Sequence, residues 1–202
     1  MNRFYEEIKD VYRLRVPFED LYTSVFLIKS EYGLILVDSA TTDEDVKTHI
    51  VTALKKAGYS LSDIDKLVLT HSHRDHAGGL SEILRLAPNI EVVRDVREIF
   101  DGIYTVSMPG HTEDSIGVLD TRSGTLISGD GLQGAGVGKY RCSTQNPIKY
   151  LDTVDRIKKD ERIKNILFSH AYEPWDCDCA IGRHAVDECL FECLKYVKEK
   201  KQ

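Results

Sequence analysis

Four potential metal ligands stand within six consecutive residues of the chain: His71, His73, Asp75 and His76. They follow residues 66–70, an apolar segment that is typical of a short buried strand. Side chains at i and i+2 of an extended segment point the same way, so His71 and His73 can reach one metal ion. Asp75 and His76, on the turn that follows, can address a second ion. Imidazole and carboxylate donors suit Zn, Fe or Mn.

Three further candidate ligands come after other apolar strand segments: His111, Asp130 and His170. Binding residues gather at strand ends in layered α/β folds. Any one of them alone would be an ordinary loop residue, and a histidine-rich loop is often only solvated, but the combination favours a metal centre. The two remaining histidines, His49 and His184, fall on expected helices and are predicted to be surface residues.

The chain between these residues alternates between strand and helix patterns. Strands are expected at 11–16, 21–29, 34–39, 66–70, 90–93, 103–108, 115–120, 125–129 and 165–169, and helices at 41–57, 78–88, 148–158 and 184–200. Thr41 or Thr42 is expected to cap the first helix, and Gly58 to end it. This order predicts a layered α/β protein that forms one domain over residues 1–202.

The composition is that of an ordinary globular protein, with 42% hydrophobic and 30% charged residues among 202. The net charge of -6 and the scattered Lys and Arg residues argue against nucleic-acid binding. No apolar run reaches the about 20 residues that span a bilayer, so no membrane association is expected. The N-terminus lacks the apolar core of a signal peptide, and we therefore expect a cytoplasmic protein.

The ligand series resembles the pattern of the metallo-β-lactamase-fold hydrolase superfamily over nearly the full length of the chain. The matching residues, in the family's order, are Asp38, His71, His73, Asp75, His76, His111, Asp130 and His170. The resemblance implies an αβ/βα sandwich with the metal site along one edge. It also implies two divalent metal ions, with zinc as the first candidate and iron or manganese as alternatives.

The same resemblance implies a role for each residue. His71, His73 and His111 would hold the first ion, Asp75, His76 and His170 the second, and Asp130 would bridge both. Asp38 looks like the residue that supports the metal loop from behind, and a simple turn residue is the alternative.

A two-metal centre of this kind predicts hydrolysis of a small-molecule substrate. Two ions about 3.5 to 4 Å apart share one water and lower its pKa toward about 7, so that hydroxide is available at neutral pH. The hydroxide would attack an ester, thioester or lactone carbonyl. Asp75 would orient this nucleophile and carry the proton to the leaving group. Whether the chain forms a homo-oligomer stays open.

A glycine-rich segment bears on the substrate. Residues 136–140 resemble the part of glyoxalase II (hydroxyacylglutathione hydrolase) that offers a Lys and a Tyr to glutathione. Lys139 is therefore expected to pair with a substrate carboxylate, and Tyr140 to contact the substrate. The family's Tyr falls one residue later, at Arg141, and the chain ends soon after His170, without room for that enzyme's helical glutathione-binding domain. A flexible loop with a solvated lysine is the alternative.

Other functions stay open beside a thioesterase or esterase. A lactone hydrolase is the nearest, although the tyrosine that lactone-cleaving relatives carry soon after Asp130 has no counterpart here. An iron-dependent sulfur dioxygenase, a phosphodiesterase and an inactive metal-binding scaffold are the others. A true β-lactamase is not expected, because those enzymes usually lack an Asp at the bridging position.

The chain has five cysteines, an odd number that favours reduced thiols over a disulfide framework. Four of them, Cys177, Cys179, Cys189 and Cys193, are close enough in sequence to form a structural zinc site. Their spacing is unusual for such a site, so buried or loop cysteines are the alternative. Trp175 either lines the pocket or packs against neighbouring residues.

Overall fold

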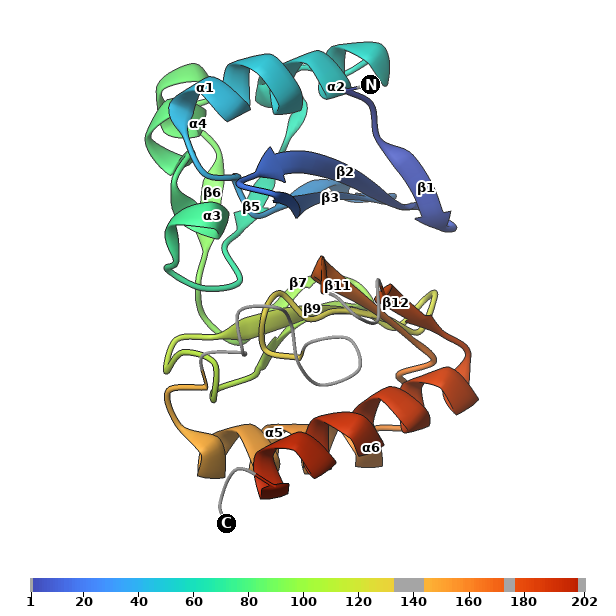
Figure 1. The fold of residues 1–202 in the computed structure, drawn as a ribbon. Coiled ribbons are helices and arrows are strands. Elements are labelled where there is room, and N and C mark those ends of the chain that lie inside the picture. The colour runs from blue at the N-terminus through green and yellow to red at the C-terminus, as the bar shows by residue number, and fades with distance from the viewer. Residues whose placement is uncertain (1, 133–143, 173–176, 200–202) are drawn as a thin grey trace. The chain divides into compact units, whose positions relative to one another are not determined.

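The computed structural model describes residues 2–132, 144–172 and 177–199 (Figure 1). It divides the chain into two compact units, Met1–Arg94 (unit 1) and Asp95–Gln202 (unit 2). Each unit contains a six-stranded mixed sheet and helices. One domain over residues 1–202 stays a prediction.

The sheet of unit 1 has the strand order β1-β2-β3-β4-β5-β6. The strands are β1 (Tyr5–Ile8), β2 (Val11–Phe18), β3 (Leu21–Ser30), β4 (Gly33–Val37), β5 (Lys66–Val68) and β6 (Glu91–Val93). The first four pair antiparallel, whereas β4, β5 and β6 run parallel. Parallel neighbours end at the same edge of a sheet, so the residues after β4 and after β5 emerge side by side.

The helices of unit 1 follow β4 and β5. They are α1 (Asp43–Asp45), the π-helix η1 (Val46–Val51), α2 (Thr52–Lys56), the 3-10 helix η2 (Leu61–Asp63), α3 (Arg74–Ala77) and α4 (Leu80–Leu86). The first three run on without a break, as one helix. Thr42 caps it, since its hydroxyl accepts a hydrogen bond from the Asp45 amide at 3.1 Å, and Gly58 follows it with a φ of +84°. The predicted start and end of this helix are thus confirmed.

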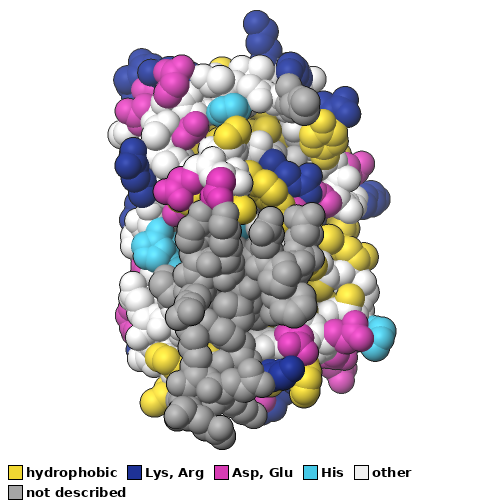
Figure 2. All heavy atoms as spheres, in the orientation of Figure 1, with side chains coloured by type: hydrophobic (Ala, Val, Ile, Leu, Met, Phe, Trp, Pro, Cys, Tyr) yellow, Lys and Arg dark blue, Asp and Glu magenta, His cyan; other side chains and the backbone are white. Residues whose placement is uncertain are grey.

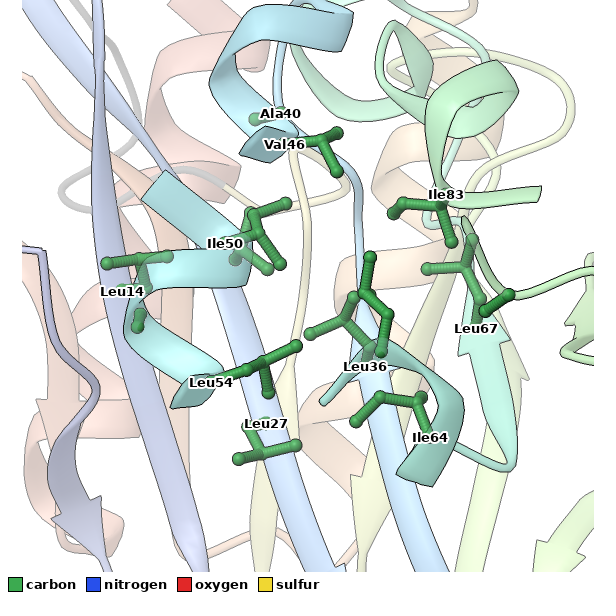
Figure 3. Packing of buried hydrophobic residues seen from close by; sticks show 14 of the residues in the cluster. Leu14, Leu27, Leu36, Ala40, Val46, Ile50, Leu54, Ile64, Leu67 and Ile83 are labelled. Atoms are coloured by element: carbon green, nitrogen blue, oxygen red, sulfur yellow. The ribbon is translucent and has the colours of Figure 1, made fainter. Parts of the chain in front are cut away.

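Apolar side chains of the sheet and the helices form the core of unit 1 (Figure 3). Leu14, Leu27 and Leu36 point from the strands toward Ile50 and Leu54 of the long helix. Burying each of these side chains contributes roughly 1.5 to 3 kcal/mol. The apolar side chains of this helix therefore face the sheet, whereas Ala57, just after its end, is exposed.

The sheet of unit 2 has the order β12-β11-β10-β9-β8-β7. Its strands are β7 (Glu98–Phe100), β8 (Ile103–Ser107), β9 (Ile116–Asp120), β10 (Thr125–Ile127), β11 (Asn165–Tyr172) and β12 (Cys177–Ile181). Among the described strand pairs of this second sheet, only β10 and β11 run parallel. Its helices are α5 (Pro147–Lys159) and α6 (Arg183–Glu199).

The core of unit 2 lies between this sheet and its two helices. Tyr150, Val154 and Ile157 of α5 recur at helical spacing and are buried, as is Leu190 of α6. Asn146 caps α5, with its side chain accepting a hydrogen bond from the Lys149 amide at 3.1 Å.

Three strands have no counterpart among the predicted elements: β1, β7 and β12. Each lies at an edge of its sheet, where one side of the strand has no neighbour and few apolar residues are required. The helix expected over 78–88 is shorter, beginning at Leu80, and the separate turn α3 precedes it.

The two histidines expected at the surface, His49 and His184, differ in the exposure of their side chains. The side chain of His184 is 90% exposed, as predicted. That of His49 is only 18% exposed, and its Nδ1 lies 3.0 Å from Oδ1 of Asn2. The N-terminal segment covers it, which no local pattern around residue 49 indicates.

Candidate metal centre

Unit 1 brings its four candidate ligands together just after β5. His71 and His73 each offer a ring nitrogen, and these two atoms lie within 4.8 Å of one another. Their rings meet edge to face, with centroids 4.7 Å apart. The i and i+2 spacing therefore places both imidazoles near one point, as the sequence predicts.

The other pair lies in the first turn of α3. Nε2 of His76 is 3.2 Å from Oδ2 of Asp75, and the side chains are 0% and 15% exposed. Two ligands held by one ion at about 2.0 to 2.2 Å, with a tetrahedral angle between them, lie about 3.3 to 3.6 Å apart. The Asp75 and His76 separation is close to that range.

Asp38 connects this turn to the end of β4. Its carboxylate is fully buried, and its Oδ1 accepts a hydrogen bond from the Thr70 amide at 2.8 Å. Its Oδ2 lies 2.9 Å from the Thr70 hydroxyl and 2.7 Å from Nδ1 of His76. Asp38 has a φ of +66°, a left-handed conformation that Asp adopts more readily than most residues. The carboxylate therefore holds the two ends of the ligand loop together.

These contacts decide which ring nitrogens can bind a metal. An ionised carboxylate only accepts, so Nδ1 of His76 carries the hydrogen and Nε2 keeps its lone pair. The Thr70 hydroxyl gives its single hydrogen to Asp38, so at 3.1 Å it accepts from Nδ1 of His71. Nε2 of His71 then also keeps its lone pair. Sequence reasoning missed Thr70; its signal is a hydroxyl directly before the first histidine.

Gly78 and Gly79 follow α3 at positions where no side chain fits. A Cβ on Gly78 would lie 2.0 Å from the Thr41 carbonyl oxygen, and one on Gly79 would lie 2.2 Å from that of Ser39. Both glycines have negative φ angles, so close packing rather than a left-handed backbone requires them. The loop after β4 thus lies directly against the end of the ligand turn.

Gly78→Ala is expected to lower the free energy of unfolding by about 1 to 3 kcal/mol, because the Cβ overlaps backbone atoms. Chemical denaturation measures this loss. Gly58→Ala is the comparison: it has no heavy atom within 4 Å of the new Cβ and suffers only from its positive φ, about 1 kcal/mol. Equal losses in the two variants would contradict the close-packing explanation.

Unit 2 brings together the other three candidates. Asp130 follows β10, and His170 lies in β11, the parallel neighbour of β10, so both come to the same edge of the sheet. The pairing of β11 with β12 is irregular between Leu167 and Tyr172, around His170. His111 follows β8, on a loop where Gly110 has a φ of +143° and packs against Tyr150.

The Asp130 carboxylate stands between two imidazoles. Its Oδ1 is 3.3 Å from Nε2 of His170, and its Oδ2 is 3.5 Å from Nε2 of His111. All three side chains are at most 8% exposed. Both separations fall in the range for two ligands of one ion, and each oxygen faces a different histidine. The residues therefore fit a divalent metal site with Asp130 as a shared ligand.

Several residues named from the sequence lie outside the described residues: Lys139, Tyr140, Arg141 and Trp175. The fifth cysteine, Cys142, does so too. Cys177 and Cys179 lie on β12, and Cys189 and Cys193 on α6. Among the described residues, no three of these thiols gather as a metal site would require.

No helix in the described parts of the chain combines the length and the apolar character needed to cross a bilayer. On the face drawn in Figure 2, acidic and basic side chains are interspersed over the described surface.

The sequence of this chain is similar to those of several known proteins. Residues 19–100 match the Metallo-beta-lactamase superfamily. A hydroxyacylglutathione hydrolase of Vibrio cholerae is 31% identical over 163 residues, which cover 68% of this chain and 63% of that protein. An atrochrysone carboxyl ACP thioesterase of Pseudocercospora fijiensis is 27% identical over 145 residues, covering 61% of this chain and 43% of that one. The chain spans about half the length of the first curated relatives that it matches.

The solved structures agree on the fold. A metallo beta lactamase from Erythrobacter litoralis, crystallised with beta mercaptoethanol in the active site, superposes with a TM-score of 0.70 at 19% identity. The match covers 97% of this chain and 96% of that one. The predicted α/β sandwich class, with two mixed sheets plus helices, is confirmed. The match over residues 19–100 identifies a metallo-beta-lactamase superfamily domain in this chain.

Proposed function

We propose that the chain is a metal-dependent hydrolase that cleaves small acyl thioesters or esters. Two divalent metal ions, with zinc as the first candidate, would be held by the ligand series named from the sequence: His71, His73, Asp75, His76, His111, Asp130 and His170. The observation that carries the proposal is the buried Asp130 carboxylate, whose two oxygens face two different imidazoles at 3.3 and 3.5 Å. The thioester class is supported by the names of the relatives, a hydroxyacylglutathione hydrolase and a thioesterase.

Bound divalent ions would supply a water of lowered pKa and polarise the substrate carbonyl. The chain's own side chains would orient the attacking water, transfer its proton and hold the ligand rings in place. Asp75, partly accessible at its carboxylate, is the group to orient the attacking water, take its proton and deliver it to the leaving thiolate or alkoxide. Asp38 and Thr70 keep Nε2 of His71 and of His76 free of hydrogen, which pre-organises both rings for their task.

The test is elemental analysis of protein purified without added metal, together with assays on S-lactoylglutathione, a homoserine lactone and a phosphodiester. Close to two metals per chain with thioester turnover is the expected result. One iron per chain without hydrolysis would overturn the proposal in favour of oxygen chemistry. Tight metal binding with no turnover on any ester would leave only a metal-binding scaffold, and selective cleavage of the lactone or phosphodiester would reassign the substrate.

Lys139 and Tyr140 are proposed to contact the substrate, with Lys139 pairing with a carboxylate. Lys139→Ala is then expected to raise KM for S-lactoylglutathione several-fold and to leave KM for the neutral ester phenyl acetate unchanged. Steady-state kinetics on both substrates measure the difference. An equal rise on both would argue against a role in recognition.

A further inference from the structure

The loop that carries the proposed ligand His111 is held by helix α5. The carbonyl groups of residues 109–111 all accept hydrogen bonds from α5 or from the two residues before it. The donors, in the order of these carbonyls, are the Thr153 hydroxyl at 2.8 Å, the Asn146 amide at 3.0 Å and the Gln145 amide at 3.3 Å. The path of the loop is therefore set by α5 as well as by the strand β8 that precedes it.

The backbone of the loop lies directly against the helix at Gly110. A Cβ on this residue would lie 2.5 Å from Cα of Tyr150, and the φ of Gly110 is +143°, a conformation that glycine adopts without strain. No side chain stands between the two backbones to absorb a displacement. Because His111 is the next residue, a shift of this contact also shifts its imidazole.

Thr153 is the side chain that fastens the loop to the helix. It lies in the middle of α5 and is fully buried, and its hydroxyl donates to Pro109 instead of back-bonding to a carbonyl of its own helix. Nη2 of Arg156 lies 3.1 Å from Oγ1 of Thr153 and 3.0 Å from the Ser107 carbonyl oxygen. A guanidinium only donates, so the hydroxyl accepts from Arg156 and its single hydrogen is left for Pro109. The charge of Arg156 also polarises the hydroxyl and strengthens the bond that it donates.

The imidazole that depends on these contacts faces Asp130. Its Nε2 is 3.5 Å from Oδ2 of that residue, and the His111 side chain is 4% exposed. Zinc binds imidazole nitrogen at about 2.0 to 2.1 Å, so a small displacement of the ring weakens binding. We propose that Thr153, oriented by Arg156, is a positioning residue that directs the His111 imidazole to its metal position. The inference rests on the proposed function, in which His111 is a metal ligand, and it adds a helix hydroxyl that acts only through the backbone.

Thr153→Val keeps the branched shape of the side chain but cannot donate to Pro109. Zinc affinity is expected to fall about three- to tenfold, less than the about 10- to 100-fold that follows loss of a direct partner of a ligand ring, because Thr153 acts through the loop. Competition with a zinc chelator measures this affinity. Thr153→Ser restores the hydroxyl and should bring the affinity back to within about twofold of the parent protein.

Thr121→Val is the matched control. The Thr121 hydroxyl donates to the Gly102 carbonyl, also at 2.8 Å, at the end of the β8 and β9 pair opposite the loop that carries His111. Its loss should lower stability in chemical denaturation and leave zinc affinity unchanged. If Thr153→Val does not fold, Arg156→Met is the second variant, since it removes only the exposed side chain that orients the hydroxyl. We expect about two- to threefold weaker zinc binding in Arg156→Met.

Zinc binding as tight as that of the parent protein in Thr153→Val, or in Arg156→Met if the first variant does not fold, would overturn the proposal. So would an equal loss of affinity in Thr121→Val, or no recovery in Thr153→Ser. The chelator titration needs no substrate, which separates this inference from the proposed function. Weaker zinc binding in a variant of a protein that cleaves no thioester or ester would reject the hydrolase and retain the positioning role. Turnover of S-lactoylglutathione with unchanged zinc binding in the variants would retain the hydrolase and reject the positioning role.

Discussion

Asp130→Ala is expected to lower kcat/KM for S-lactoylglutathione by about 10³-fold and to reduce the metal content of the purified protein. Each Asp130 oxygen faces a different buried imidazole, so the substitution removes the group that both proposed ion positions share. It also leaves His111 and His170 with no carboxylate between them. Steady-state kinetics and elemental analysis on the same preparation measure the two effects together.

A matched control is available in the same unit. Asp120 is also a buried aspartate near a strand end, but its carboxylate accepts hydrogen bonds from Arg122 at 2.8 and 2.9 Å and belongs to no proposed ligand set. Asp120→Asn should lower stability and retain the metals and kcat. Full activity with two metals per chain in Asp130→Ala would show that Asp130 is not a shared ligand.

The second large effect is expected from Asp38→Asn, which keeps the shape of the side chain and tolerates the positive φ. The amide oxygen can still accept from the Thr70 amide, but the NH2 group then donates toward Nδ1 of His76. That ring would have to move its hydrogen to Nε2, where a metal could no longer bind. We expect zinc affinity to fall about 10- to 100-fold with little loss of stability.

Competition with a zinc chelator measures this affinity, and chemical denaturation measures the stability. Asp38→Ala provides the contrast, because it leaves the buried Thr70 amide without an acceptor and puts an Ala in a left-handed conformation. That variant should lose about 2 to 4 kcal/mol of unfolding free energy. If Asp38→Asn binds zinc as tightly as the parent protein, Asp38 does not set the His76 tautomer, and its contribution is structural only.

The features that could be predicted from the sequence depend on interactions between residues close together in the chain. The spacing of His71 and His73 puts two rings on the same side because side-chain direction alternates along an extended chain. Thr42 and Gly58 bound a helix because capping and positive φ depend on single residues. The order of the strands and helices was sufficient for the fold class, whereas β1, β7 and β12 were missed because edge strands need no distinct apolar pattern.

Other features depend on residues that are distant in the chain. Gly78 is needed because Thr41, 37 positions earlier, lies against it. His49 was expected at the surface, but Asn2 binds it. Thr70 acquires its role from Asp38 across the parallel pair β4 and β5. The contacts of Gly78 and His49 leave no trace in the sequence near either partner, and the hydroxyl before His71 does not by itself reveal that Asp38 is its acceptor.

The sequence by itself thus determined which side chains are available for metal chemistry and their order along the chain, because ligand type and short spacing are local properties. Tertiary structure decided how Asp130 lies between His111 and His170, since the parallel pairing of β10 and β11 brings two strand ends to one edge. Such arrangements arise from strand register and close backbone packing, which involve residues far apart in the chain.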